Sequence, residues 1–204
     1  TYDREGPLEE FDRKPGVPDP DDSAIQETIR NRFLGKIEQV PPDASAVHVG
    51  GERAYRKMRQ GREFNIPARS VEIALCKIVT YAYPNLQLNV ACGSGTYIRS
   101  LANDLGESLR VGAYLAGLRR TKVGEWSVDN AVTTDDVKWS DVMPLKDVLK
   151  DHARLSLTEA EFQDIQHGKI IQQSCAANTI AWCNDLPVAI LEEKDGGVKA
   201  RKVL

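Results

Sequence analysis

The chain has 204 residues and a formal net charge of -3, with 41% hydrophobic and 28% charged residues. This length suffices for one or two domains with hydrophobic cores, and the composition is that of a globular protein, which argues against a disordered or fibrous chain. No apolar run approaches the ~20 residues of a membrane span, and the four cysteines form no C-x-x-C pair. We therefore expect a cytoplasmic protein with neither a membrane nor a metal site.

The charge is unevenly distributed along the chain. Residues 1–43 hold 6 Lys and Arg against 11 Asp and Glu (net -5), and residues 44–126 hold 12 against 6 (net +6). Residues 127–204 hold 9 against 13 (net -4). A basic middle between acidic flanks is a recognised sign of nucleic-acid contact, although a solvated charged face gives the same pattern. On charge alone, both interpretations stay open.

The first elements are predicted from turn residues and apolar spacing. Residues 1–22 are rich in Asp, Glu, Pro and Gly without an apolar period, which favours an extended surface segment. A helix is predicted next, because Ser23 and Gln26 form a capping box and apolar residues recur every four positions from Ile25. Gly35 is expected to end this helix.

The basic middle segment is predicted to hold two helices and a hairpin. Residues 52–60 favour a helix with a strongly basic face. Apolar and polar residues alternate over residues 71–92 around the turn signal at 83–85, which predicts an antiparallel hairpin with Cys92 in the core. A period of 3.6 over residues 98–109 then predicts an amphipathic helix.

The acidic last part is predicted to form a small separate domain. We expect a strand over residues 118–126, and a connector with short helical pieces over residues 129–151. Thr158 and Glu161 form a capping box at the start of a short helix. Short strands are then expected near residue 170 and over residues 180–183, 187–191 and 198–204, with a hairpin turn at residues 195–197. A helix with several short strands is typical of a small β-barrel.

The most informative motif is the string from Cys92 to Gly106, in which a glycine turn opens a helix. Such a turn can bind a phosphate through its free N–H groups, but this one lacks the Lys-Ser/Thr of a P-loop and the third glycine of a dinucleotide fingerprint. As a whole, the string resembles the C-x-x-G-T-Y-I-R-x-L-x-x-D-L-G motif of bacterial TruB-type tRNA pseudouridine synthases.

Three further segments resemble motifs of the same family in the same order. Gln39-Val40-Pro41-Pro42 with Ser45-Ala46 and residues 50–61 is similar to Q-x-P-P-x-x-S-A followed by G-x-x-x-Y and R-x-G. Residues 118–126 resemble L-R-R-T-x-x-G-x-F, with Trp126 in place of Phe. Residues 2–6 resemble its D-x-E-G segment, and the tail from Leu155 resembles its small RNA-binding PUA-like domain.

The resemblance implies an α+β fold in two parts. Residues 1–150 would be the C-terminal part of a catalytic domain with a mixed, largely antiparallel sheet and flanking helices, and residues 151–204 a PUA-like β-barrel. It also implies an isomerase that converts a T-loop uridine of tRNA to pseudouridine, by base flipping and an Asp nucleophile, without metal or organic cofactor. The expected partner is the T stem-loop of tRNA, and the expected state is a monomer.

The family motif also implies roles for individual residues. Tyr97 would lie against the flipped base, Leu118 would pack on it, and Arg99 would pair with the catalytic carboxylate. The implied RNA contacts are Arg59, His48, Arg119, Arg120 and Lys122. Spacing alone equally allows Tyr97 as a packing residue, Arg99 as a surface helix charge and the basic residues as solvated faces.

The sequence also departs from the family pattern. The nucleophile of the family lies in a G-x-L-D-P segment, a string that does not occur in these 204 residues, and Asp104 lies at a helical position without that role. The chain opens at Thr1, so we expect a piece of a longer protein that is inactive alone. Ala44 and His48 stand where the family usually has Tyr and Lys. An inactive RNA-binding module, and an interaction protein without an RNA role, are the alternatives.

Overall fold

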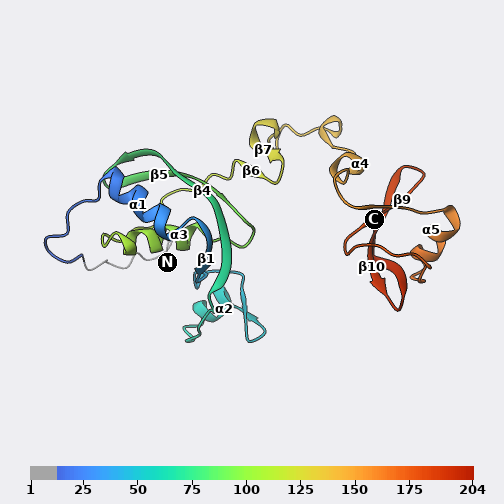
Figure 1. Cartoon of the computed structure of the whole chain (residues 1–204), viewed down its shortest axis with the longest axis horizontal. Helices are drawn as coiled ribbons and strands as arrows, with labels where there is room; N and C mark the ends of the chain where they lie inside the picture. Colours follow the sequence, from blue (N-terminus) through green and yellow to red (C-terminus); the bar gives the residue numbers. More distant parts are fainter. Residues whose placement is uncertain (1–12) are drawn as a thin grey trace. The chain divides into compact units, whose positions relative to one another are not determined.

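The computed structural model describes residues 13–204, so the D-x-E-G resemblance at residues 2–6 lies outside the described residues. The chain divides into two compact units, the first ending at Arg120 and the second spanning Thr121–Leu204 (Figure 1). The boundary expected at residue 150 separates a catalytic domain from an RNA-binding domain. The division into compact units does not test it, so it stays a prediction. Within residues 13–204, no helix is long and apolar enough to cross a membrane.

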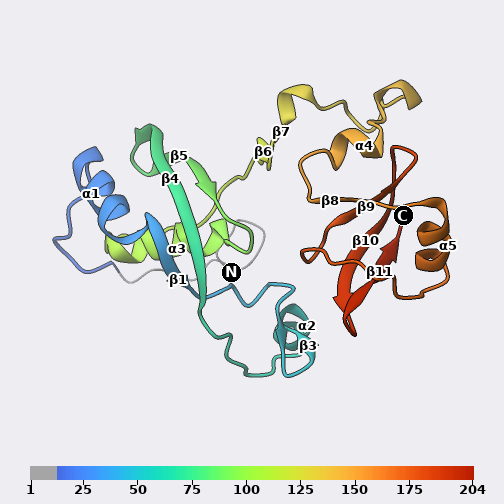
Figure 2. The ribbon, with the colours of Figure 1, turned by 45° about the vertical axis from the view of Figure 1, so that its right-hand side comes forward.

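The first unit is a three-stranded antiparallel sheet with strand order β1-β4-β5 and with helices packed on it. In chain order its elements are α1 (Asp22–Arg32), β1 (Gly35–Gln39), β2 (His48–Val49), β3 (Glu52–Arg53), α2 (Ala54–Arg59), β4 (Arg69–Ala82), β5 (Asn85–Cys92) and α3 (Ile98–Ser108). The chain between β1 and β4 leaves the end of the sheet and carries β2, β3 and α2 (Figure 2).

The core of the first unit lies where α1 and α3 meet the sheet. Helix periodicity gives each of the two helices one apolar stripe, and both stripes face β4. The buried residues of this core are Ile25, Ile29, Phe33, Ile73, Cys76, Leu101 and Leu105. This packing fixes α3, and with it the start of the helix that carries Tyr97 and Arg99.

The predicted elements of the first unit are present, with two corrections. Helix α1 begins at Asp22, and its N-cap is Asp21, whose carboxylate accepts a hydrogen bond from the N–H of Ala24 at 2.7 Å, so the cap predicted at Ser23 is wrong. The hairpin and the helix at residue 98 are confirmed. Cys92 is exposed, contrary to expectation, because it ends an edge strand beyond the residues of β5 that pack on the core.

The second unit contains a four-stranded sheet with strand order β11-β10-β9-β8, in which only β8 and β9 run parallel. Its elements in chain order are β6 (Lys122–Val123), β7 (Trp126–Ser127), η1 (Val128–Asn130), η2 (Trp139–Asp141), α4 (Leu145–Val148), β8 (Arg154–Ser156), α5 (Glu159–Gln166), β9 (Ile180–Cys183), β10 (Leu186–Lys194) and β11 (Gly197–Val203). Its core lies between α5 and this sheet, and its buried residues are Leu157, Ile165, Ile171, Ala181, Ala189, Leu191 and Val198.

Local signals in this unit are confirmed. The capping box is formed, with the N–H of Glu161 donating to the Thr158 hydroxyl and the N–H of Thr158 donating to the Glu161 carboxylate. Asp195 and Gly196 both have positive φ, which suits the tight turn between β10 and β11. A closed PUA-like barrel is not confirmed, since the strands in the described part of the chain form an open sheet.

The strand predicted over residues 118–126 is wrong. This segment holds only the two residues of β6 and the first residue of β7, which pair across a tight turn at residues 124–125. Gly124 has a φ of +56°, a left-handed conformation that interrupts an extended strand. The connector with short helical pieces that was expected after it is confirmed by η1, η2 and α4.

Candidate functional site

The start of α3 places two of the predicted site residues together. A turn follows β5, in which Gly95 has a φ of +83° and the Thr96 hydroxyl donates to the carbonyl of Gly93 at 2.9 Å. Tyr97 is the N-cap of α3, with extended backbone angles of φ -98° and ψ 109°, and Arg99 lies on the first turn. Both side chains are partly exposed. The glycine turn therefore presents Tyr97 and Arg99 at one end of one helix.

Gln39, at the end of β1, holds the main chain of Tyr97. The N–H of Tyr97 donates to Gln39 Oε1 at 2.7 Å, and Gln39 Nε2 donates to the carbonyl oxygen of Tyr97 at 3.1 Å. Gln39 is only 2% exposed, and these two bonds use both ends of its amide. A buried amide must find partners for both of its polar atoms. Here a single residue, 58 positions away in sequence, supplies both.

Two more hydrogen bonds join α3 to the segment that follows Gln39. The hydroxyl of the fully buried Ser100 donates to the carbonyl of Val40 at 2.7 Å. Arg99 Nη2 donates to the carbonyl of Ala44 at 2.9 Å. The Q-x-P-P segment and the G-T-Y-I-R segment, separate in the sequence, thus form one local structure.

The ring of Tyr97 packs against a small apolar cluster outside the main core. This cluster contains Val47, Ala54 and Ile66 as buried members, with Val49 and Phe64 beside Tyr97. These residues come from β2 and the segment just before it, from α2, and from the loop before β4. One side of Tyr97 is therefore covered by the excursion between β1 and β4, while the residue stays only half-buried.

A basic group of side chains lies on that same excursion. Arg59 is exposed and stacks over the ring of Tyr55, with 5.6 Å from its guanidinium carbon to the ring centre. Hydrogen bonding with Arg56 lowers the pKa of Tyr55. His48 is exposed on β2, opposite Arg53 on β3. The predicted RNA contacts His48 and Arg59 thus lie in one small substructure beside Tyr97.

The remaining predicted residues lie apart from this group in the sequence. Leu118, Arg119 and Arg120 are exposed near the end of the first unit, and Lys122 is exposed on β6. Leu118 is 63% exposed and so lies outside the hydrophobic cores. Its expected packing on a base beside Tyr97 stays a prediction.

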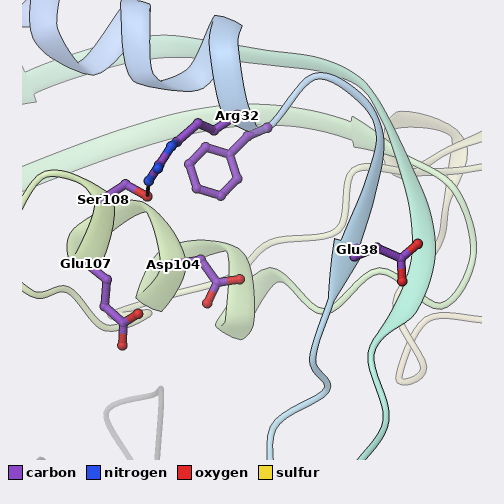
Figure 3. Close-up of a pocket in the computed structure, with 6 residues that line it drawn as sticks. Arg32, Glu38, Asp104, Glu107 and Ser108 are labelled. Carbon is purple, nitrogen blue, oxygen red and sulfur yellow. Dashed lines mark hydrogen bonds between the residues drawn. The ribbon is translucent and has the colours of Figure 1, made fainter.

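A separate hollow of about 540 Å³ lies between α1, β1 and α3 (Figure 3). Its lining residues are Arg32, Phe33, Glu38, Asp104, Glu107 and Ser108. Arg32 donates to the Ser108 hydroxyl at 2.9 Å across it. Burial raises the pKa of Asp104, hydrogen bonding from Asn103 lowers it by less, and the nearby charge of Glu107 makes a smaller contribution to the rise. The described residues contain no group of three or more His, Cys, Asp or Glu that could hold a metal ion.

Sequence reasoning missed the positions of Gln39 and Ser100 in this arrangement. Both belong to the motif segments, but their spacing assigns them no contact. One property of the sequence could have indicated the role of Gln39. It is a polar residue at the end of a strand that packs on a core, and a buried amide there needs hydrogen-bond partners. Its partner, 58 positions away, is visible only in the folded chain.

Comparison with known families gives two matches. The family model described as the N-terminal domain of the TruB family pseudouridylate synthases matches residues 1–98. The model described as the tRNA pseudouridylate synthase B C-terminal domain matches residues 99–153. Together they cover three quarters of the chain.

Relatives and solved structures agree with these matches. The tRNA pseudouridine synthase B of Thermobifida fusca is 39% identical over 186 residues, which cover 85% of this chain and 61% of the relative. That of Deinococcus radiodurans is 33% identical over 201 residues, covering 83% and 64%. The chain spans about half to two thirds of the length of such relatives. A crystal structure of a Cbf5-Nop10-Gar1 complex contains a chain of the same fold, with a TM-score of 0.64, 19% identity and coverage of 92% of this chain and 63% of that one.

Proposed function

Because the chain belongs to the TruB family of pseudouridylate synthases, we propose that the protein converts a uridine in the T loop of tRNA to pseudouridine. In this isomerisation the glycosidic bond to nitrogen breaks, and the same base is rejoined through carbon. The observation that carries the proposal is the shared location of Tyr97 and Arg99 at the start of α3, held there by hydrogen bonds to residues 39–44. The T stem-loop would be the bound part of the tRNA, with a monomeric enzyme acting in the cytoplasm.

The proposed role of Tyr97 is to hold the target base outside the RNA stack. An enzyme that reacts at a base must extrude it and then cover its faces with aromatic or apolar groups. Tyr97 is supported on one side by its apolar cluster and is half-exposed, which suits a ring that receives a base. Leu118, an exposed apolar side chain, would pack on the same base.

The proposed role of Arg99 is to keep the reacting carboxylate ionised. A cation within about 4 to 6 Å favours the charged form of a carboxylate, and an arginine stays charged at every relevant pH. Arg99 is anchored to the carbonyl of Ala44, which fixes the direction of its guanidinium group. A nucleophilic Asp placed beside it would therefore stay reactive at neutral pH.

The proposed phosphate contacts lie on exposed basic side chains. Arg59 and His48 would bind the backbone beside Tyr97, and Arg119, Arg120 and Lys122 would bind it on the other motif segment. Each neutralised phosphate releases counterions, so binding must weaken steeply with salt. His48 offers an imidazole where the family usually has a lysine ammonium, and it is expected to add less to phosphate binding.

A second candidate function is an RNA-binding module without catalysis. The observation that favours it is that the exposed basic side chains of His48 and Arg59 lie on the substructure beside Tyr97, which suits RNA binding by itself. In this case the chain would bind a T stem-loop but form no pseudouridine. The two candidates share an RNA site and differ only in turnover.

One pair of measurements tests both candidates. The affinity of the 204-residue chain for a fluorescent T-stem-loop RNA is measured by anisotropy over a range of salt concentrations, and we expect a log–log slope of about -0.7 to -0.9 for each phosphate contacted. Arg59→Ala should reduce this slope by about one contact, whereas Lys146→Ala, in α4, should not. A slope near zero would rule out the RNA site.

Turnover then separates the synthase from the binding module. Pseudouridine is assayed with the 204-residue chain and with a longer form that carries a G-x-L-D-P segment. The synthase proposal expects pseudouridine from the longer form, and Arg99→Ala should abolish it while leaving RNA affinity nearly unchanged. A longer form that binds the RNA without any turnover would favour the binding module.

A further inference from the structure

Gln39 is a buried polar side chain beside the proposed base site. It is 2% exposed, and both hydrogen bonds of its amide go to the main chain of Tyr97, at 2.7 and 3.1 Å. A pair of hydrogen bonds that accepts from an N–H and donates to the C=O of the same residue is the pattern that one antiparallel strand offers another. The side chain of Gln39 thus acts on Tyr97 as a neighbouring strand would.

This contact lies where the chain changes from turn to helix. Tyr97 has no side-chain cap, and its carbonyl oxygen also accepts the first bond of α3, from the N–H of Leu101 at 3.0 Å. The backbone of a helix N-cap is extended and is not held by helical bonds on its N-terminal side. Gln39 supplies the missing restraint, because it fixes both polar groups of this one residue.

We propose that Gln39 is a positioning residue, which holds the main chain of Tyr97 so that the Tyr97 ring and Arg99 keep the geometry needed to receive the target base. This inference rests on the proposed function. Displacement of a binding group by about 1 Å can reduce its effect by about 10²-fold, so a restraint on this backbone acts directly on the proposed site. Gln39 itself faces the main chain of Tyr97 and acts through it.

Substitutions can separate this role from simple filling of space. Gln39→Met keeps nearly the same volume but makes neither hydrogen bond, whereas Gln39→Glu keeps the acceptor for the Tyr97 N–H and loses the donor. We therefore expect the main chain of Tyr97 to be held most firmly in the wild type, less firmly in Gln39→Glu and least firmly in Gln39→Met. The matched control is Gln87→Met, because Gln87 is an exposed glutamine on β5 far along the sheet from Gln39. If Gln39→Met does not fold, Gln39→Asn replaces it, since its amide is one methylene too short to reach both groups.

The first measurement uses the protein without RNA. Amide hydrogen exchange of Tyr97, followed by NMR, should be slow in the wild type and in Gln87→Met. It should be at least about tenfold faster in Gln39→Met, with Gln39→Glu between them, while exchange in the middle of α3 stays unchanged. Equal exchange at Tyr97 in wild type and Gln39→Met would overturn the inference, whatever the RNA experiments show.

The second measurement uses a T-stem-loop RNA with 2-aminopurine next to the T-loop uridine, whose fluorescence rises when neighbouring bases unstack. We expect Gln39→Met to bind this RNA with nearly wild-type affinity. The equilibrium constant for unstacking in the bound RNA, obtained from the fluorescence rise, should fall by about tenfold, which corresponds to about 1.4 kcal/mol. Gln39→Glu should recover part of this loss. Affinity and fluorescence lost in parallel would show a general structural role and overturn the inference. If the wild type itself does not bind the RNA, the proposed function fails, and the positioning role toward RNA fails with it.

Discussion

Gln39 and Tyr97 are 58 positions apart in the sequence, yet the Gln39 amide accepts from the N–H of Tyr97 and donates to its C=O. The neighbouring contacts, from Ser100 to Val40 and from Arg99 to Ala44, also end on main-chain carbonyls. Since the acceptor at position 44 is its carbonyl oxygen, the contact with Arg99 does not depend on which side chain stands there. The departure from the family pattern at Ala44 therefore leaves the anchoring of Arg99 intact.

Gly106, in α3, leaves no room for a Cβ atom, and its substitution gives the first prediction. A Cβ at this position would lie 2.2 Å from the nitrogen of Ala113 and 2.4 Å from the carbonyl carbon of Gly112, which are main-chain atoms that cannot rotate away. We expect Gly106→Ala to destabilise the first unit by about 1–3 kcal/mol, because overpacking outweighs the better helix propensity of alanine. Hydrogen exchange of the α3 amides in the two proteins measures this difference.

Gly117→Ala is the matched control for this prediction. No atom lies within 4 Å of a Cβ built at Gly117, and its φ is not in the left-handed region. The control should change stability by no more than about 0.5 kcal/mol. Unchanged exchange in Gly106→Ala would mean that the turn at residues 111–113 moves to admit a methyl group, and the tight packing of α3 would then be wrong.

Elements with strong local signals were predictable from the sequence. The hairpin of β4 and β5 follows from alternation around a proline turn, and α3 follows from a 3.6-residue period after a glycine turn. The capping box at Thr158 is local by nature, since both of its partners lie within four residues. In the site, the motif predicted that Tyr97 and Arg99 lie together, because one helix turn carries both.

Features that depend on distant partners were not predictable. The cap of α1 at Asp21 competes with Ser23 two residues later, and spacing does not decide between two good capping residues. The exposure of Cys92 depends on how far the helices extend over an edge strand, which no property of that strand encodes. The burial of Gln39 likewise depends on the main chain of Tyr97.

Asp104 gives a prediction about pH. Burial raises the pKa of its carboxyl group, so the folded first unit favours the protonated form more than the unfolded chain does. The stability that this preference contributes is fully present below the ordinary aspartate pKa of about 3.9 and is lost as the pH rises through the raised pKa. Asp104→Asn has no charge at any pH. It should therefore be more stable than the wild type at pH 7, with a difference that shrinks on acidification.

Urea unfolding of the first unit at pH 7 and at pH 4, followed by far-UV circular dichroism and by exchange of the α3 amides, measures this effect. Glu63→Gln removes a negative charge from an exposed position of the same unit and should leave stability unchanged at both pH values. An Asp104→Asn variant that is less stable than the wild type at pH 7 would show that the ionised carboxylate makes a favourable contact.

Glu161 gives a prediction of the opposite sign in the second unit. Its pKa is lowered, first by the hydrogen bond from the N–H of Thr158 and then by those from Gln173 and the Thr158 hydroxyl. The stability from these bonds is fully present above the ordinary glutamate pKa of about 4.3 and is lost as the pH falls from there through the lowered pKa.

All three tryptophans lie beyond residue 120, so their fluorescence reports the thermal unfolding of this unit. Between pH 7 and pH 3 the wild type should lose more stability than Glu161→Gln, and Glu125→Gln, a control at an exposed position of the same unit, should follow the wild type. Parallel curves for wild type and Glu161→Gln would show that the capping box makes no charge-dependent contribution to folding.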